Sequence, residues 1–353
     1  MILKKRILVA PLNWGLGHAT RCIPIIEALE NHGFEPIIAS DGAALALLRK
    51  EFSHLTALEL PSYPIEYAKK GLFFKLKMIS QTPDFLKAIK EEKRAIRKIV
   101  KEHAIGGVIS DNRLGAYSNS VPSVIITHQL NVLTGTTTWI TSRIHHIFIK
   151  KYSECWVPDV DNGLNLSGKI GHTFNESLNI KYIGPLSRLH KKAVAKKYDL
   201  MVILSGPEPQ RTFLEDKLRI ELSDFTGKAI FISGVVEPKE VITETKHITF
   251  HNFMNSAALE QAFNESELVV CRPGYTNIMD LAQLGKKAFF IPTPGQYEQE
   301  YLARKLKKSR LAPYATQTDF KIEDLHKADL YKGLKYVADD VKWKDLFCLF
   351  EGK

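Results

Sequence analysis

The chain of 353 residues is 44% hydrophobic and 25% charged, which is typical of a soluble globular protein with two domains of ordinary size. Its four cysteines lie far apart without C-x-x-C spacing, so neither a disulfide framework nor a zinc site is expected. No run reaches the roughly 18 apolar residues of a membrane helix. The net charge of +10 lies mostly in residues 1–190, where 24 Lys and Arg face 16 Asp and Glu, and this favours an anionic partner, either nucleic acid or a membrane surface.

The chain opens with a short apolar strand and a glycine loop. Residues 7–10 (ILVA) are too few for the apolar region of a signal peptide and are predicted to form a first strand. The loop contains GLGH at 15–18, and residues 19–32 have the apolar spacing of a helix. The dinucleotide pattern G-x-G-x-x-G is not met, because a larger residue stands where the third small residue belongs.

His18 stands at the start of this helix and is the first candidate for chemistry. In an α/β domain such a position faces the ligand cleft, and the helix dipole would lower the pKa of the imidazole and keep it a neutral base. The alternative is a helix-start histidine that only bonds a nearby carbonyl. The residues by themselves leave both interpretations open.

The stretch 63–79 combines lysines with large apolar residues, in the sequence YPIEYAKKGLFFKLKMI. It fits a basic and apolar patch that rests on an anionic bilayer, and it equally fits a lid or core helix with solvated lysines. Residues 83–103, rich in Lys, Glu and Arg, are predicted to form a long amphipathic surface helix.

The predicted strand 107–111 ends in the polar Asp111, and the polar residues Thr127-His128 directly follow the next predicted strand, 121–126. Because chemistry in such sheets gathers at the carboxyl ends of strands, Asp111 and His128 join His18 as candidates, although each is also compatible with a structural role.

The Asp-Val-Asp run at 159–161 has the spacing of a manganese-binding motif. It follows a strand end and precedes Asn-Gly, so it is predicted to be a loop, and no metal is expected. A domain boundary is expected close to residue 187, where Gly184-Pro185 and a basic stretch precede a fresh strand at 199–204. The domains are therefore 1–187 and 188–335, followed by a final amphipathic helix within 336–353.

Residues 268–301 form a second unit of strand, glycine turn, helix and strand, in which Gly285 is expected to cap the helix. Arg272 and Gly274 lie at the turn, where helix N–H groups favour a phosphate. Asp280 follows eight residues after the arginine. The Asp280 carboxylate could accept ribose hydroxyls, and Gln299-Glu300 could bind a sugar, so the spacing fits a nucleotide-sugar site. An ordinary βαβ unit with an arginine of no special function fits the same spacing.

The pattern of this stretch resembles the nucleotide-sugar signature of GT-B glycosyltransferases, closest to family 28 (the MurG-like, UDP-sugar-dependent type). The resemblance is carried here by Arg272, Gly274, Asp280, Pro292, Gln299 and Glu300, and by the GLGH loop. Asp280 replaces the usual Glu, and Glu300 replaces a second Gln. The H-Q-L-N run at 128–131 is similar to the H-E-Q-N run of the family.

The resemblance implies an α/β protein of the GT-B fold. Two Rossmann-like domains would face each other across a cleft, with the last helix crossing back to the first domain. His18 would be the general base, with Asp111 in reserve. On the acceptor side it implies Gly15, Gly17, His128 and Asn131. On the donor side it implies Arg188, Gly206, Arg211, Phe253, Met254, Arg272, Gly274, Thr276, Asp280, Gln299 and Glu300.

The function expected from the resemblance is an inverting, metal-independent transfer of a hexosyl or N-acetylhexosaminyl group. The donor would be a nucleotide sugar, most simply a UDP-sugar, and the acceptor lipid-linked or a glycan, with no cofactor. The expected location is cytoplasmic, with peripheral attachment to the inner face of an anionic cytoplasmic membrane as an option. Alternatives are a UDP-GlcNAc-type 2-epimerase on the same fold and a non-enzymatic nucleic-acid-binding protein, although no RNA or helix-turn-helix motif is present.

Overall fold

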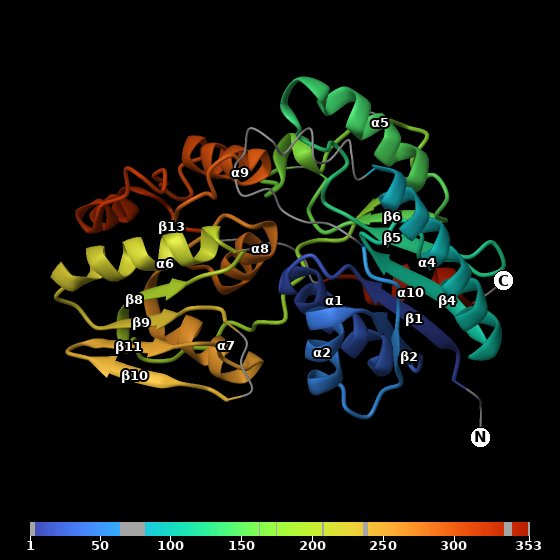
Figure 1. Ribbon diagram of the computed structural model, residues 1–353, viewed down its shortest axis with the longest axis horizontal. Helices are drawn as coiled ribbons and strands as arrows, with labels where there is room; N and C mark the ends of the chain where they lie inside the picture. The colour runs from blue at the N-terminus through green and yellow to red at the C-terminus, as the bar shows by residue number, and fades with distance from the viewer. Residues whose placement is uncertain are drawn as a thin grey trace. The chain divides into compact units, whose positions relative to one another are not determined.

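A computed structural model describes residues 4–63, 82–161, 163–173, 175–206, 208–235, 239–334 and 341–351. The chain divides into two compact units, Met1–Leu186 with Ala338–Lys353, and Ser187–Val337. Each unit is built on one sheet with helices on its faces (Figure 1). The basic and apolar stretch predicted over 63–79 lies outside the described residues, apart from Tyr63.

The first unit contains a seven-stranded parallel sheet in the order β3-β2-β1-β4-β5-β6-β7. Its strands are β1 (Arg6–Pro11), β2 (Glu35–Ser40), β3 (Ala57–Glu59), β4 (Ile105–Asp111), β5 (Ser123–Ile126), β6 (Glu154–Val157) and β7 (Ile180–Tyr182). Its helices are α1 (Leu16–Asn31), α2 (Gly42–Glu51), α4 (Thr82–Glu102), α5 (Thr138–Ile149) and α10 (Trp343–Glu351), with short 3-10 turns η2 (Gly135–Thr137) and η3 (Gly168–Ile170).

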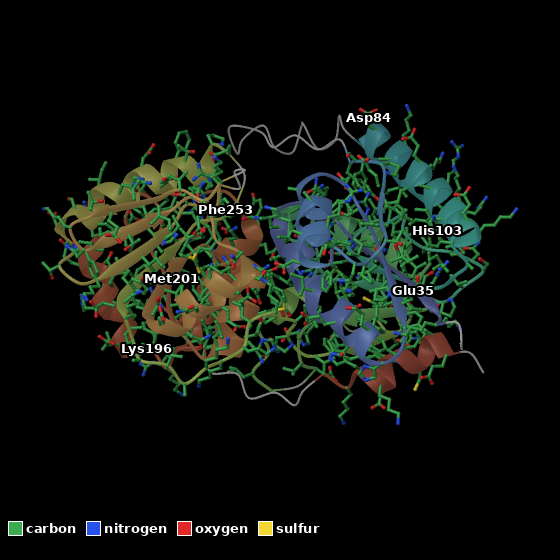
Figure 2. All side chains as sticks on the ribbon, turned by 90° about the horizontal axis from the view of Figure 1, so that it is seen from below. Glu35, Asp84, His103, Lys196, Met201 and Phe253 are labelled. Atoms are coloured by element: carbon green, nitrogen blue, oxygen red, sulfur yellow. The ribbon has the colours of Figure 1, made fainter. Side chains whose placement is uncertain are left out.

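The apolar runs explain why these segments form a parallel sheet. The four residues 7–10 of β1 are completely buried, as expected for a strand that is covered on both faces by helices. The first strand and the long helix predicted over 83–103 are both confirmed. Figure 2 labels Asp84 in the first turn of α4 and His103 directly after the helix. Lys98 and Glu102 pair at 3.8 Å on its exposed face, which fits a solvated helix surface.

Helix α10 packs within the first unit through two aromatic residues. The Phe347 ring lies 5.7 Å from the ring of Phe34 and 6.4 Å from that of Trp156, centroid to centroid. Phe350 occupies the space beside Gly107, where an added Cβ would lie only 2.3 Å from the phenylalanine ring. A glycine in β4 is therefore needed for the helix to approach the sheet this closely.

The second unit contains a six-stranded sheet in the order β10-β11-β9-β8-β12-β13. Its strands are β8 (Tyr198–Ile203), β9 (Ala229–Ile232), β10 (Ile242–Thr245), β11 (Ile248–His251), β12 (Ser266–Cys271) and β13 (Lys287–Phe290). All neighbours are parallel except the β10–β11 hairpin, which the sequence did not predict. Its helices are α6 (Gln210–Glu221), α7 (Ser256–Glu265), α8 (Tyr275–Leu284) and α9 (Tyr297–Lys308), with 3-10 segments η4 (Leu222–Asp224) and η5 (Ile322–Leu330).

Local signals at the ends of helices have the expected effects. Gly285 follows α8 in the left-handed conformation with φ 65°, which confirms the predicted C-cap. Asn255 precedes α7, and its side chain accepts a hydrogen bond from the backbone N–H of Ala258.

All four cysteines are free thiols. In the part of the chain that the structure describes, no helix is both long and apolar enough to cross a bilayer.

Candidate functional site

Each sheet has one place where the strand order reverses, and ligands of open α/β sheets bind beyond the carboxyl ends of the strands at that place. In the first unit the reversal lies between β1 and β4, and in the second unit between β8 and β12. The predicted site residues that follow these four strands are therefore neighbours within their own unit.

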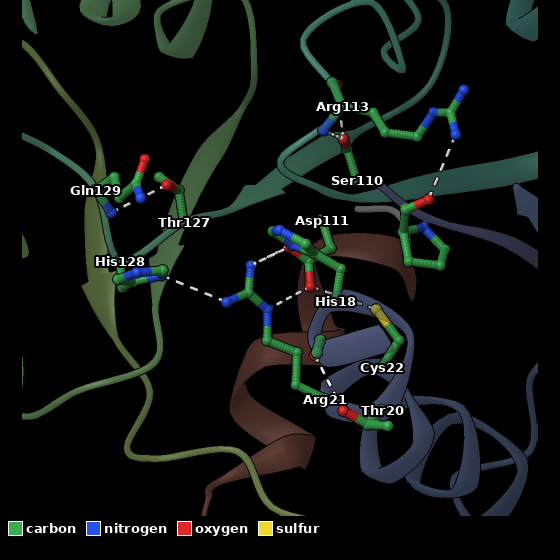
Figure 3. A network of polar contacts seen from close by, with 12 residues as sticks. His18, Thr20, Arg21, Cys22, Ser110, Asp111, Arg113, Thr127, His128 and Gln129 are labelled. Carbon is green, nitrogen blue, oxygen red and sulfur yellow. Dashed lines mark hydrogen bonds and ion pairs between the residues drawn. The ribbon is translucent and has the colours of Figure 1, made fainter. Parts of the chain in front are cut away.

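In the first unit, His18 and Asp111 meet at the reversal point. His18 lies in the first turn of α1, directly after the loop that follows β1, and Asp111 is the last residue of β4. Nδ1 of His18 lies 3.0 Å from Oδ1 of Asp111 (Figure 3). The fold thus joins two residues that are 93 positions apart in the chain.

Arg21 completes this cluster and was not predicted as a site residue. It lies one helical turn after His18, only 2% exposed, and its Nε and Nη2 both donate to the carboxylate of Asp111 (Figure 3). Its Nη1 lies 3.3 Å from Nδ1 of His128, which is also buried. The spacing of three residues from His18, on one face of a predicted helix, was the available signal.

The pairing with Arg21 argues against Asp111 as a reserve base. Burial raises the pKa of the Asp111 carboxyl, but the charges of Arg21 and His18 outweigh that effect and hold the pKa well below its usual range. A carboxylate that stays ionised and accepts two hydrogen bonds from a guanidinium is a weak proton acceptor. The Asp111 carboxylate is instead placed to orient the His18 ring by accepting a hydrogen bond from it.

His18 is held as a neutral imidazole. Burial lowers its pKa most, the Arg21 charge lowers it further, and Asp111 only partly offsets both effects. The direction agrees with the sequence-based expectation. Nη2 of Arg21 lies 2.9 Å from the same Nδ1, so Arg21 and Asp111 compete for this atom. Only the tautomer that donates Nδ1–H to Asp111 leaves Nε2 free to accept a proton.

The other residues expected on the acceptor side have mixed environments. Gly15 precedes α1 with φ 80° and has open space where a side chain would be, whereas Gly17 lies inside the first turn of the helix. Asn131 has a structural role instead, because its amide donates to the carbonyls of Lys169 (2.6 Å) and His172 (2.8 Å).

The Asp-Val-Asp run forms a turn, as predicted. The carboxylate of Asp159 is buried and accepts hydrogen bonds from the backbone N–H groups of Val160 (2.9 Å), Leu166 (2.9 Å) and Ser167 (2.7 Å). These contacts organise the loop after β6.

In the second unit, two glycine loops lie side by side at the reversal point. Gly206 follows β8 with φ 108°, and Gly274 follows β12 as the residue before α8. Open space lies beside both, where a Cβ would meet no atom within 4 Å. The amide of Asn277 reaches Ser205 at 3.5 Å and links the two loops. The positive end of the α8 helix dipole lies at these loops, and it favours an anion.

Arg272 lies beneath these loops and not on their surface. It is 1% exposed, and its Nη1 donates to the carbonyls of Ile291 (3.0 Å) and Pro292 (2.9 Å). Its Nη2 donates to Gln210 O (3.0 Å) and to Gln317 Oε1 (2.7 Å). The expected direct phosphate contact is therefore not available to these nitrogens.

The charge of Arg272 is nevertheless uncompensated. Every acceptor named for it is an uncharged carbonyl oxygen, and no ion pair with a carboxylate is found for it among the described residues. Burial lowers its pKa to about 10, so the guanidinium remains charged at neutral pH. A buried cation without a counter-ion makes the adjoining loops favourable for an anionic ligand.

Asp280 is a poorly solvated carboxyl on α8. Its Oδ1 accepts a hydrogen bond from Ser187 Oγ at 2.6 Å. Burial raises its pKa to about 6, against the lowering effects of Ser187 and of the Arg188 charge. Arg188 also donates to Ser256 Oγ (2.9 Å) at the start of α7, so the linker, α7 and α8 converge on this carboxyl.

Arg211 is engaged differently from what the sequence predicts. Its Nε donates to Glu208 at 2.6 Å and its Nη1 to Glu215 at 2.5 Å. Two carboxylates neutralise the guanidinium, so a phosphate would have to compete with both. The loop after β8 and the start of α6 lie where the sequence predicts them. The guanidinium of Arg211, however, is engaged by carboxylates and not placed to bind the donor.

The remaining donor-side candidates lie near the carboxyl ends of the strands of the second sheet. Gln299 accepts from the Thr293 N–H (2.8 Å) and Glu300 from the Gly295 N–H (3.0 Å), so both side chains fix the turn before α9. Thr276 lies half-buried in the first turn of α8. Phe253 and Met254 lie half-buried between β11 and α7.

Comparison with known proteins shows what the second unit resembles. Residues 214–334 match the glycosyltransferase family 28 C-terminal domain. This match indicates that the protein is a glycosyltransferase that resembles family 28. A Haemophilus ducreyi relative is 23% identical over 92% of this glycosyltransferase and 88% of the relative. It is named UDP-N-acetylglucosamine--N-acetylmuramyl-(pentapeptide) pyrophosphoryl-undecaprenol N-acetylglucosamine transferase.

Solved structures agree on the fold of the glycosyltransferase. The MurG crystal structure from Acinetobacter baumannii matches with a TM-score of 0.58 and 13% identity, over 99% of both chains. The glycotransferase of kitacinnamycin matches with a TM-score of 0.62 and 14% identity, over 93% of this chain and 90% of the other. The expected GT-B fold of two Rossmann-like units is confirmed.

Proposed function

We propose that the protein is an inverting transferase that moves a hexosyl or N-acetylhexosaminyl group from a UDP-sugar to a lipid-linked or glycan acceptor. The observation that carries this proposal is the second unit, which contains the family 28 match and whose reversal point joins open glycine loops, an uncompensated buried arginine and a poorly solvated carboxyl. The Haemophilus ducreyi relative is named for a UDP-sugar donor and a pyrophosphoryl-undecaprenol acceptor.

The donor half of the reaction follows from the second unit. The diphosphate would lie at the start of α8, where the helix dipole favours an anion, with Arg272 supplying positive potential from below. Asp280 would accept the ribose hydroxyls, replacing the Ser187 hydroxyl as one of its donors. Positive potential at this edge would stabilise the charge that develops on the departing diphosphate.

The acceptor half follows from the first unit. Nε2 of His18 takes the proton of the acceptor hydroxyl while Nδ1–H donates to Asp111. The acceptor oxygen forms a bond to the anomeric carbon as the bond from that carbon to the diphosphate oxygen breaks. Attack on the face opposite the leaving group inverts the anomeric configuration. The buried Asp111–Arg21 pair keeps the imidazole oriented.

We further propose that transfer needs no metal ion. Neutral N–H groups and Arg272 would supply the positive potential at the diphosphate, and Asp159 is committed to its own turn. Activity is expected to persist in EDTA. A loss of activity in EDTA that Mn²⁺ or Mg²⁺ restores would contradict this part of the proposal.

Peripheral attachment to the inner face of the cytoplasmic membrane belongs to the same proposal. A lipid-linked acceptor stays in a bilayer, so its transferase must work at that surface. The excess of basic residues in positions 1–190 favours an anionic lipid surface.

A thermal-shift screen across UDP-, GDP- and TDP-sugars tests the donor. A UDP-sugar at 100 times its Kd is expected to stabilise the protein by about 2.7 kcal/mol, and Asp280→Asn should remove most of the shift. Product analysis with an acceptor extract then separates transfer from epimerisation. Epimer formation from the donor alone, or the absence of a shift with every nucleotide sugar, would contradict the proposal.

A further inference from the structure

A cleft lies at the C-terminal end of α9 in the second unit (Figure 1). Its volume is about 640 Å³, which is within the range of small-molecule sites. We name it the α9 cleft. Of the described residues that line it, none is Asp or Glu, and four are cations, namely Arg304, Lys307, Lys308 and Arg310.

Three of these cations have no carboxylate partner. In the part of the chain that the structure describes, no ion pair is found for Lys307, Lys308 or Arg310. Arg304 reaches Glu300, one helical turn earlier, at a distance of 3.8 Å. Cations that line one cleft repel each other, and a bound anion would relieve that repulsion.

Arg310 occupies a backbone position that favours glycine. It follows the end of α9 with φ 55°. Its N–H donates to Lys307 O at 3.0 Å and the Leu311 N–H to Leu306 O at 2.9 Å, which are the paired bonds of a Schellman motif. The helix dipole explains the lysines of the last turn. It does not explain a large side chain at a left-handed position, and this favours a use for the Arg310 guanidinium.

Backbone contacts hold the walls of the α9 cleft in place. The Lys332 N–H donates to Arg310 O at 3.0 Å, which fixes the segment after η5 against the end of α9. Tyr314 forms a parallel bridge with Phe290, the last residue of β13. Lys307 Nζ lies 5.3 Å from the centre of the Tyr314 ring. The cations and this ring therefore belong to one preformed site.

The remaining walls are aromatic and apolar. Tyr314 and Tyr331 are half-buried, and Leu330 is 76% exposed. Tyrosine rings stack on planar groups, whereas guanidinium and ammonium groups bind phosphate oxygens. An inorganic anion would use only the cations. A nucleotide would use the rings as well, and a cleft of this volume suits one nucleotide better than a run of nucleic acid.

We propose that the α9 cleft binds a nucleotide with two or more phosphates, with the phosphates at Lys307, Lys308 and Arg310 and the base against the tyrosine rings. The cleft is distinct from the proposed donor site, because Lys308 lies about 12 Å along α9 from Glu300. The inference does not depend on the proposed transfer reaction.

Titration calorimetry with ATP and with inorganic tripolyphosphate, without metal ion, donor or acceptor, tests the α9 cleft. The wild type is expected to bind ATP more tightly than tripolyphosphate. Lys307→Gln with Arg310→Gln should weaken the binding of both about tenfold or more, because charge-assisted contacts to phosphate are lost. The matched control is Lys228→Gln with Lys246→Gln. It removes the same charge from exposed residues of the second unit and should bind as the wild type does.

Tyr331→Ser separates the contribution of the base from that of the phosphates. It should weaken ATP binding about tenfold, because the base loses a ring on which it stacks, and should leave tripolyphosphate binding unchanged. Circular dichroism should show that every variant is folded. ATP binding by the wild type that is no tighter than tripolyphosphate binding would overturn the nucleotide assignment.

Two other outcomes would overturn the α9 cleft as the site. One is ATP binding that is equal in the wild type and the variant without Lys307 and Arg310, or absent from both, since no nucleotide would then occupy the cleft. The other is an equal loss in the control variant, which would show general attraction to a basic protein. The thermal shift with UDP-sugars is measured separately, so failure here leaves the transfer reaction standing.

Discussion

At the scale of single residues, the decisive feature is a neutral imidazole held by a buried ion pair. His18 is kept uncharged by burial and by Arg21, while Asp111 stays ionised beside both. Nδ1 of His18 contacts both the Arg21 guanidinium, a donor, and the Asp111 carboxylate, an acceptor. The tautomer therefore decides whether the other ring nitrogen, Nε2, can act as a base.

Replacing His18 tests this role directly. His18→Gln should lower kcat by about 10²- to 10⁴-fold, because a positioned general base contributes that much, and should leave the donor-induced thermal shift intact. The matched control is His54→Gln, an exposed histidine paired with Glu30 at 2.8 Å, which should keep full activity. A His18→Gln enzyme within threefold of wild-type kcat would contradict the assignment.

The buried Asp280 carboxylate should lower the free energy of unfolding at neutral pH, although it serves the proposed binding of the donor. Its folded pKa of about 6 lies above its ordinary value of 3.8, so stability that is present below pH 3.8 is lost as pH rises through 6. Asp280→Asn does not titrate and should raise the free energy of unfolding at pH 8 by up to about 3 kcal/mol. Urea unfolding should show this gain shrinking toward zero at pH 4. A gain that is equal at pH 4 and pH 8 would refute the explanation.

At the scale of secondary structure elements, the Arg21–Asp111 pair ties α1 to β4. Both side chains are buried, so removing one partner strands a charge in the core. Arg21→Met alone should therefore destabilise the protein by about 3–5 kcal/mol. Arg21→Met combined with Asp111→Leu should cost less than the sum of the two single changes, as measured by a double-mutant cycle in urea. Additive losses would show that the two residues act independently.

At the scale of the whole molecule, two units with separate cores should respond to different changes. Phe347→Ala removes a buried ring from the first unit and should destabilise that unit by about 3–5 kcal/mol. A UDP-sugar should protect the second unit, where its proposed site lies. Hydrogen exchange resolved along the chain should show the two effects in different residues. Donor protection confined to residues 4–63 would contradict the assignment of the donor site.

The sequence by itself determined several strands of both sheets, the long helix α4 and the C-terminal end of α8. Buried strands were visible as apolar runs at 7–10 and 107–111, and the Gly285 cap was visible because a left-handed residue favours glycine. These signals are local, since they depend on backbone conformation and on side-chain period. The β10–β11 hairpin was missed because β10 is exposed along its whole length and has no buried apolar side.

Only the tertiary structure decided what the polar residues do. Arg272 was expected to contact a phosphate, but its guanidinium donates to carbonyl oxygens, including that of Gln210, which lies 62 positions away in the chain. Arg21 belongs to the site only because β4 places Asp111 beside the first two turns of α1. Burial and charge pairing depend on residues that are far apart in the chain, so no local pattern records them.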